Sequence, residues 1–208
     1  MVQTIPAKEI TLRQLRHRFN LERTDDEQFF REWQDDLPEL TEFEKQLLGQ
    51  VKEEYLYLSE SPLLEVILKM VIISPLLRLA GFYRHPFELT AEKEVKITSE
   101  DDGIIVNGRI DILIFKPELW VTVIEAKGTK YALAAGIPQV LAYMLTNPNP
   151  EQPILGFITN GNEFKFLKMT TTEPPQYAQS YTFALENKDD LYTVLRILKR
   201  INQTIQNP

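Results

Sequence analysis

The sequence predicts an α/β domain built on a mixed sheet, with a helical segment in front of it. Segments with helical apolar spacing alternate with runs rich in Val, Ile and Phe, and three of those runs follow one another across short turn signals. The composition, 43% hydrophobic with 8 Gly and 13 Pro in 208 residues, supplies enough apolar material for one packed domain. We therefore divide the chain into a helical extension, residues 1–58, and an α/β domain, residues 59–208.

Two helices are predicted before the first strand. Residues 41–58 open with Thr and Glu in capping-box spacing and continue with apolar residues at helical intervals. A second helix is expected over residues 61–81, because a Ser-Pro pair starts it and a Gly ends it. Pro75 should kink or restart this helix, and its apolar character on almost all sides predicts that it is buried.

Three consecutive strands are predicted next, over residues 87–97, 104–115 and 119–126. They are rich in β-branched and aromatic residues, and Asp-Asp-Gly and Lys-Pro-Glu turn signals divide them. Joints this short cannot carry the crossover that parallel neighbours need, so the strands should form an antiparallel meander.

The rest of the chain predicts a helix, a strand pair and a final helix. The helix lies within residues 131–145, either kinked at Pro138 or starting there. Residues 154–169 have the pattern of two strands around an Asn-Gly turn, and residues 189–205 place apolar side chains along one helical face.

Cysteine is absent and histidine occurs only twice, which limits the chemistry. A thiolate zinc site and a cysteine nucleophile are excluded, so any metal must be held among oxygens. No phosphate-binding loop of the G-x-x-x-x-G-K-[ST] type occurs. Because neither a signal pattern nor a membrane-spanning apolar stretch is visible, we expect a cytoplasmic protein with no membrane partner.

The net charge of −7 is unevenly distributed. Residues 25–60 hold twelve acidic and three basic residues, a local charge of −9, so the rest of the chain sums to +2. Phosphate binding needs Lys and Arg, and this remainder tolerates DNA without demanding it. The acidic segment has the pattern of a solvated helix face.

Two neighbouring strands carry carboxylates. Side chains alternate along a strand, so Glu125 and Lys127 share one face of the third strand, and Asp111 can meet Glu125 across the pair. Two carboxylates this close repel each other unless a proton or a cation joins them. Mg²⁺ is commonly held by one or two carboxylates with waters and substrate phosphate, and Lys127 could orient a water or stabilise developing charge. On spacing alone, an exposed ion pair explains the same residues.

Three further side chains join the candidate site. Glu65 lies in the most apolar helix, where it either has a buried cationic partner or sits favourably near the helix N-terminus. Gln139 and Tyr143 are spaced i and i+4, so they share one face of the next helix. Core packing of Tyr143 with a solvent-facing Gln139 is the purely structural explanation of that spacing.

These segments together resemble the PD-(D/E)XK nuclease superfamily, and within it the nuclease domain at the start of type I restriction enzyme R subunits and RecB-like nucleases. The resemblance covers about residues 60–170. It is carried, in order, by Glu65 with Ile73-Ser74-Pro75-Leu76-Leu77 and Gly81-Phe82, then Gly108-Arg109-Ile110-Asp111, Val123-Ile124-Glu125-Ala126-Lys127-Gly128, Gly136-Ile137-Pro138-Gln139-Val140-Leu141-Ala142-Tyr143 and Ile158-Thr159-Asn160-Gly161.

The resemblance implies a restriction-endonuclease-like core and metal-dependent cleavage of DNA phosphodiester bonds, with Mg²⁺ as cofactor and Mn²⁺ as its substitute. It implies three metal-linked acids and a lysine that acts on the water or the transition state: Glu65, Asp111, Glu125 and Lys127. It implies that Gln139 and Tyr143 support the site or touch the nucleic-acid backbone. Ile110 stands where the superfamily name has Pro, and the sequence has no motor signature, so ATP-driven cleavage is not expected.

Two functions from different classes follow from these observations. The first is a Mg²⁺-dependent DNA endonuclease or nuclease subunit of a restriction, defence or repair system, acting with a partner subunit or as a homodimer. The second is a catalytically silent module that keeps the nuclease fold for nucleic-acid binding or protein assembly, with the acidic segment as its interaction surface. The repelling carboxylates favour the enzyme, and the acidic surface favours the module. A structural domain with accidental motif matches is a third, weaker interpretation.

Overall fold

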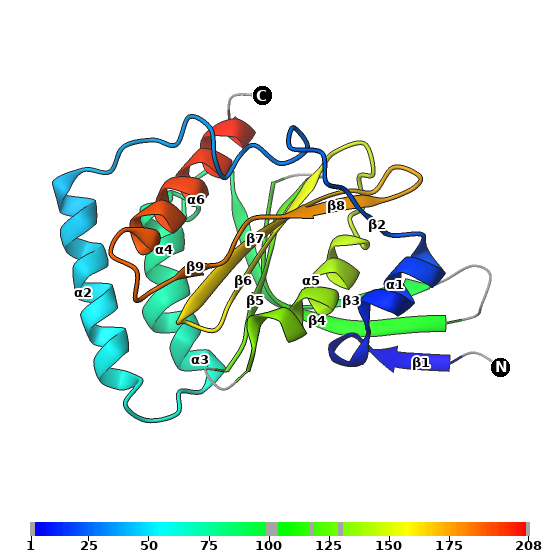
Figure 1. Cartoon of the computed structure of the whole chain (residues 1–208), viewed down its shortest axis with the longest axis horizontal. Helices are drawn as coiled ribbons and strands as arrows, with labels where there is room; N and C mark the ends of the chain where they lie inside the picture. Colours follow the sequence, from blue (N-terminus) through cyan, green and yellow to red (C-terminus); the bar gives the residue numbers. More distant parts are fainter. Residues whose placement is uncertain (1–2, 99–103, 117–118, 129–130, 207–208) are drawn as a thin grey trace.

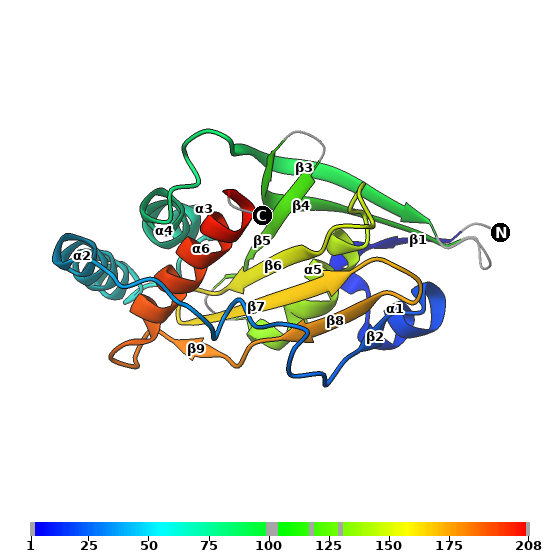
Figure 2. The ribbon, with the colours of Figure 1, turned by 90° about the horizontal axis from the view of Figure 1, so that it is seen from above.

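The computed structural model describes residues 3–98, 104–116, 119–128 and 131–206 of the chain. Over these residues one mixed sheet forms the centre of the molecule, and helices cover both of its faces (Figure 1, Figure 2). The hydrogen-bonded strand order is β1-β4-β5-β6-β7-β8-β2, with β3 paired to β4 and β9 paired to β7. The predicted α/β class with a mixed sheet is confirmed.

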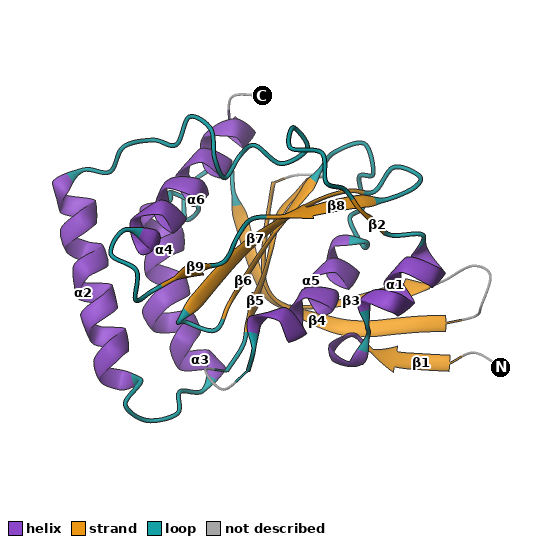
Figure 3. Cartoon of the chain, in the orientation of Figure 1, coloured by secondary structure: helices purple, strands orange, loops and turns teal. Residues whose placement is uncertain are grey.

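Figure 3 distinguishes the helices and the strands by colour. The strands are β1 (Gln3–Pro6), β2 (Glu22–Arg23), β3 (Glu88–Thr98), β4 (Ile104–Lys116), β5 (Leu119–Ala126), β6 (Ile154–Thr159), β7 (Glu163–Thr170), β8 (Gln176–Gln179) and β9 (Phe183–Ala184). The helices are α1 (Leu12–Phe19), α2 (Glu42–Leu58), α3 (Glu65–Leu68), α4 (Ser74–Leu79), α5 (Ile137–Met144) and α6 (Asp190–Gln206), with shorter helical turns η1 (Ala7–Glu9), η2 (Lys69–Ile73) and η3 (Leu133–Gly136).

The helix α2 begins with the predicted capping box. The Thr41 hydroxyl accepts from the Glu44 N–H, and the Glu44 carboxylate accepts from the Thr41 N–H at 2.8 Å. Both bonds satisfy backbone donors that have no partner inside the helix.

The second predicted helix begins later than expected. The Ser-Pro pair at residues 61–62 is not helical, and the helix starts at Glu65. From there α3, η2 and α4 form one helical stretch to Leu79, in which η2 is a π-helical turn just before Pro75. The π turn accommodates Pro75, which has no N–H to donate and would clash with the carbonyl four residues earlier.

The predicted order of the central elements is confirmed. β3 pairs antiparallel with β4, and β4 pairs antiparallel with β5, so the three strands form the expected meander. α5 has Pro138 in its first turn, which is the second of the two predicted alternatives. β6 and β7 form an antiparallel pair around Gly161, whose φ of +88° suits glycine.

The first 58 residues contribute strands as well as helices. β1 pairs in parallel with β4, and β2 pairs in parallel with β8. α1 has its own capping box and packs against α5. These strands are too short to show a period-2 pattern, which is why the sequence did not reveal them. The division at residue 58 stays a prediction, and the N-terminal segment belongs to the same sheet.

The sheet separates two apolar cores. One core lies under α2, α4 and α6 and includes the fully buried Phe157 and Leu198. The other lies under α1 and α5 and includes the fully buried Leu15 and Val140. The predicted site residues from β5 and α5 lie beside the second core, so packing of α5 on the sheet controls their geometry.

Candidate active site

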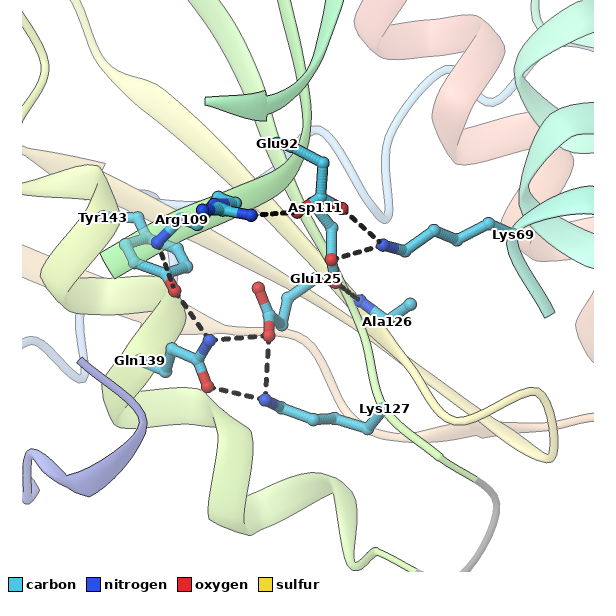
Figure 4. Close-up of polar contacts among 9 residues, drawn as sticks. All are labelled: Lys69, Glu92, Arg109, Asp111, Glu125, Ala126, Lys127, Gln139 and Tyr143. Atoms are coloured by element: carbon cyan, nitrogen blue, oxygen red, sulfur yellow. Dashed lines mark hydrogen bonds and ion pairs between the residues drawn. The ribbon is translucent and has the colours of Figure 1, made fainter. Parts of the chain in front are cut away.

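The strands β4 and β5 separate next to Asp111. Their pairing ends at Ile112 and Ile124, and the last residues of β5 pair with β6 instead. The Ala126 N–H donates to Asp111 Oδ2 at 2.7 Å. The separation of the strands therefore holds the Asp111 carboxylate beside the end of β5 and close to Glu125 (Figure 4).

Glu125 is a buried carboxylate with one bonded oxygen and one open oxygen. Its Oε1 accepts from Lys127 Nζ at 2.8 Å and from Gln139 Nε2 at 2.7 Å. Its Oε2 is buried and has no hydrogen-bond partner among the described residues. Burial and the charge of Asp111 raise the pKa of Glu125 to about 8, although Lys127 acts in the opposite direction. A proton or a cation at Oε2 would neutralise this carboxylate.

The α5 side chains complete a hydrogen-bonded network. Lys127 Nζ donates to Gln139 Oε1 at 2.6 Å, and Gln139 Nε2 donates to the Tyr143 hydroxyl at 2.7 Å. The same hydroxyl accepts from the Arg109 N–H of β4 at 3.3 Å. Burial and the charge of Glu125 raise the pKa of Tyr143 to about 12, so the hydroxyl keeps its proton. The network fixes the Lys127 ammonium in position.

Two glycines make room for this network. A Cβ at Gly108 would lie 2.5 Å from the Tyr143 ring, and a Cβ at Gly136 would lie 2.8 Å from Lys127 Cε. Both distances are below van der Waals contact, so any larger residue would displace the Tyr143 ring or the Lys127 stem. These two positions need glycine for close approach of side chains.

Lys69 is a site residue that the sequence analysis missed. Its Nζ donates to Asp111 Oδ1 at 2.5 Å and to Glu92 Oε1 at 3.2 Å. Burial lowers the pKa of Lys69, but the two carboxylates outweigh it and raise the pKa above its ordinary value. Glu92 has a φ of +55° inside β3. A non-glycine residue in that region is strained, and such strain gathers at functional sites.

Glu65 lies apart from the carboxylate pair. It is the exposed first residue of α3, so the expected burial cost does not arise. With Lys8, Lys127 and Gln139 it lines a pocket of about 300 Å³. Its charge contributes to the raised pKa of Glu125, the smallest of the causes that act on that group. Within the described residues, Glu65 therefore lines the same pocket as Lys127 and Gln139 without a hydrogen bond to either carboxylate.

The structure gathers five of the six predicted site residues into one cluster: Asp111, Glu125, Lys127, Gln139 and Tyr143. The alternative of a solvent-facing Gln139 is wrong, because this side chain is buried and bonded on both ends. Among the residues that the structure describes, no three Asp, Glu or His side chains stand close enough to share one metal ion. The assignment of Glu65 as a metal ligand stays a prediction.

The sequence held a signal for Lys69 but none for Glu92. Lys69 follows Glu65 by four residues in an apolar helix, which places both on one helical face. Glu92 stands in an ordinary polar stretch of a strand, and its positive φ is not encoded in the residue type.

The described residues form a mixed sheet that separates at two carboxylates, with a lysine two residues further along the strand, so the chain is an α/β domain with a cluster of charged side chains beside its sheet. Residues 20–175 match the family described as Type I restriction enzyme R protein N terminus. Because this match covers more than half of the chain, the chain belongs to that family. The resemblance stated from the sequence is thereby confirmed.

Seven chains of solved structures also match. One is a fragment of a Vibrio vulnificus YJ016 protein described as an HsdR subunit of a type I restriction enzyme. It is 21% identical, the match covers 64% of this chain and 25% of that chain, and the TM-score is 0.41. The present chain thus spans about a quarter of that chain. The comparison with curated proteins gave no match.

A search for membrane-spanning helices found none of sufficient length and apolar character in the described part of the chain.

Proposed function

We propose that this chain is a metal-dependent nuclease domain of a restriction system, and that it hydrolyses DNA phosphodiester bonds with Mg²⁺ or Mn²⁺. The observation that carries the proposal is Glu125, a buried carboxylate beside Asp111 with one oxygen left without a partner. Hydrogen bonds from β5, from Lys127 after it and from α5 hold this pair of carboxylates in place. A buried carboxylate oxygen without a partner, beside a second carboxylate, costs stability unless a proton or a cation neutralises it.

The residues present fit a divalent cation. Asp111 and Glu125 would hold it, and carboxylate oxygens with waters and substrate phosphate are the ligands that Mg²⁺ takes in proteins. A bound cation lowers the pKa of a coordinated water and neutralises charge on the scissile phosphate. The open Oε2 of Glu125 is the atom that this role requires.

The protein groups position the reacting atoms and supply charge. Lys127 lies at the end of β5 and lines the pocket, so its ammonium can donate to an attacking water or to a phosphate oxygen. Gln139 holds that ammonium on one side and Glu125 holds it on the other. Tyr143 keeps Gln139 in place, which makes it a positioning residue. Groups held in advance in this way do not reorganise when charge develops.

A catalytically silent module for nucleic-acid binding or assembly is the second candidate. One contact favours it: Lys69 already neutralises Asp111 through its ammonium group. If that ion pair persists, it supplies the positive charge that a metal ion would otherwise bring. The two functions then differ in whether a divalent cation displaces Lys69 from Asp111.

The test measures nicking of supercoiled plasmid by the full chain with 10 mM Mg²⁺, with Mn²⁺ and with a chelator. We expect metal-dependent nicking by the parent and none by Glu125→Gln, which keeps the shape of the side chain but removes its charge. Metal binding is measured in parallel by calorimetry without DNA. Metal binding without nicking would support a silent module, and a parent that neither binds metal nor cuts would refute the nuclease.

A further inference from the structure

Basic side chains on the two faces of the sheet differ in their partners. Those of α6, together with Lys168 of β7, are each paired with an acid: Lys168 with Glu32, Arg196 with Glu39, Lys199 with Glu44 and Arg200 with Asp36. A second group lies on the opposite face of the sheet and consists of Lys8, Arg13, Arg16 and His17. Within residues 3–98, 104–116, 119–128 and 131–206, these four side chains form no hydrogen bond or ion pair. The second group is therefore available to an anion from outside the chain.

The positive charge at the start of α1 is unfavourable for the helix itself. Arg13 is the second residue of α1, and the first turn contains no acidic residue. A cation near a helix N-terminus opposes the helix dipole, and Arg13 repels Arg16 at i+3. The dipole favours Arg16 in the last turn, but it does not explain Arg13. Arg13 therefore destabilises the start of α1 without an acidic partner that compensates for it, which indicates an anionic partner from outside the chain.

The exposed charges surround a hollow. Its volume is about 440 Å³, and it is lined by Leu12, Arg13, Arg16, His17, Leu21 and Tyr177. Of these residues Leu21 and Tyr177 are buried, while the basic side chains are exposed. A hollow lined by exposed basic side chains suits an anionic group such as a phosphate.

The hollow is connected to the candidate active site through η1. Lys8 lies in η1, which packs against α5, and it lines the pocket that also contains Lys127 and Gln139. α1 begins four residues after Lys8 and runs beside α5 (Figure 1). An eight-residue helix is about 12 Å long. Phosphates of one DNA strand advance by about 3.4 Å along the duplex axis, so α1 spans roughly three to four of them.

A further cation lies on the same face of the sheet. Lys165 lies two residues before Leu167 on β7, so both side chains lie on the same face of the strand. Leu167 belongs to the core under α1 and α5. Burial and the positive charge of Arg23 lower the pKa of Lys165. Two cations close enough to affect each other extend the positive field beyond α1.

We propose that Lys8, Arg13, Arg16 and His17, together called the α1 cation surface, bind the sugar-phosphate backbone of DNA that enters the candidate active site. This inference rests on the proposed function, because it names the surface that presents the substrate to that site. Contacts to phosphate are independent of base sequence. They weaken as the salt concentration rises, because releasing counterions from the DNA then gains less free energy. The acidic residues of α2 lie on the other side of the sheet and repel DNA from that side.

The experiment measures binding of a fluorescein-labelled DNA duplex to the full chain by anisotropy, in chelator and at several KCl concentrations. The test variant is Arg13→Gln with Arg16→Gln, which keeps good helix formers in α1. The control is Lys45→Gln with Arg200→Gln, which removes the same charge from residues that already have acidic partners. Circular dichroism and melting curves verify that both variants fold.

We expect the test variant to bind DNA about 10-fold to 100-fold more weakly at 50 mM KCl. The slope of log affinity against log salt should become less steep by about two, one unit for each lost phosphate contact. The control should stay within about twofold of the parent, as expected for cations that already have partners. Equal weakening of both variants, or no weakening of the test variant, would overturn the α1 cation surface while leaving the nuclease proposal to its metal and nicking tests. A parent that does not bind DNA would overturn the α1 cation surface directly.

Discussion

Two lysine–glutamate pairs of this molecule look alike but behave oppositely. Lys199 pairs with Glu44 at 2.6 Å, and Lys127 pairs with Glu125 at 2.8 Å, with the lysine side chains 20% and 16% exposed. Burial raises the pKa of Glu44, but Lys199 and the Thr41 donors outweigh it and lower the pKa overall. The pKa of Glu125 is raised instead, to about 8. Contact with a lysine therefore does not decide the state of a buried glutamate.

The difference comes first from deeper burial and second from a neighbouring carboxylate. Glu125 is more deeply buried than Glu44, and Asp111 adds negative charge beside it, whereas the other groups that act on Glu44 are donors. An unpartnered oxygen is not enough to mark the site, because Glu32 Oε2 is also buried without a partner, although Glu32 pairs with Lys168. What distinguishes the candidate active site is an open oxygen together with an adjacent acid.

The largest contrast between the two pairs should appear in activity. Lys127→Ala should lower Mg²⁺-dependent nicking by about 100-fold or more while the chain stays folded, because a positioned cation stabilises charge in the transition state. Lys199→Ala should leave nicking unchanged and lower the melting temperature. If the Lys127 variant cuts as fast as the parent, Lys127 does not have the assigned role.

The pH dependence of stability should have opposite signs at the two glutamates. Glu125 in the metal-free folded chain keeps a proton between about pH 4.5 and 8, where the unfolded chain has lost it. Stability should therefore fall as pH rises through that window, by on the order of a few kcal/mol, and Glu125→Gln should remove the fall. For Glu44, whose pKa is lowered, stability is lost only as pH falls below its ordinary value. Chemical denaturation at pH 5, 7 and 9 measures the effect of Glu125, and measurements below pH 4.5 measure that of Glu44. A parent with flat stability between pH 5 and 9 would contradict the raised pKa of Glu125.

Asp111→Asn should destabilise the metal-free chain by about 1–3 kcal/mol, because it removes the anionic partner of the partly buried Lys69. Charge repulsion considered alone predicts the opposite, a stabilised variant. Melting curves in chelator decide between them. Added Mg²⁺ or Mn²⁺ should raise the melting temperature of the parent and barely move that of the variant. An equal metal response of both proteins would exclude Asp111 from metal binding.

The smallest effect should come from the structural pair. Glu44→Gln should cost about 1 kcal/mol, since it weakens the ion pair with Lys199 while the amide oxygen can still accept from Thr41. The matched control is Glu39→Gln, whose side chain is 89% exposed and whose loss should be nearly neutral. Urea unfolding of both variants compares them. A larger loss from Glu39 would reverse the interpretation of these contacts.

Local patterns predicted most of the central fold correctly. The capping box at Thr41, the strand meander, and the turn at Gly161 depend on residues near each other in sequence. The start of the second helix was wrong, since a Ser-Pro pair permits a helix start without requiring one, and the chain begins its helix at Glu65 instead.

The N-terminal residues show why charge counting has to be combined with the fold. Counting charges suggests that removal of residues 1–58 would strengthen DNA binding. In the structure this segment supplies β1, whose pairing with β4 lies next to Gly108, and Ala7, which packs closely against that glycine. Removal would uncover the core beneath α5 and delete the α1 cation surface, so point variants are the sound test.

By itself the sequence determined the order of the central elements, and it predicted that Asp111, Glu125, Lys127, Gln139 and Tyr143 come together, because strand and helix periodicity decides which side chains share a face. Only the tertiary structure decided their partners. The separation of β4 from β5, the approach of Lys69 from η2 and the strained backbone of Glu92 all depend on contacts between distant segments. Burial beside a second carboxylate, which sets the pKa of Glu125, arises only when those segments pack together.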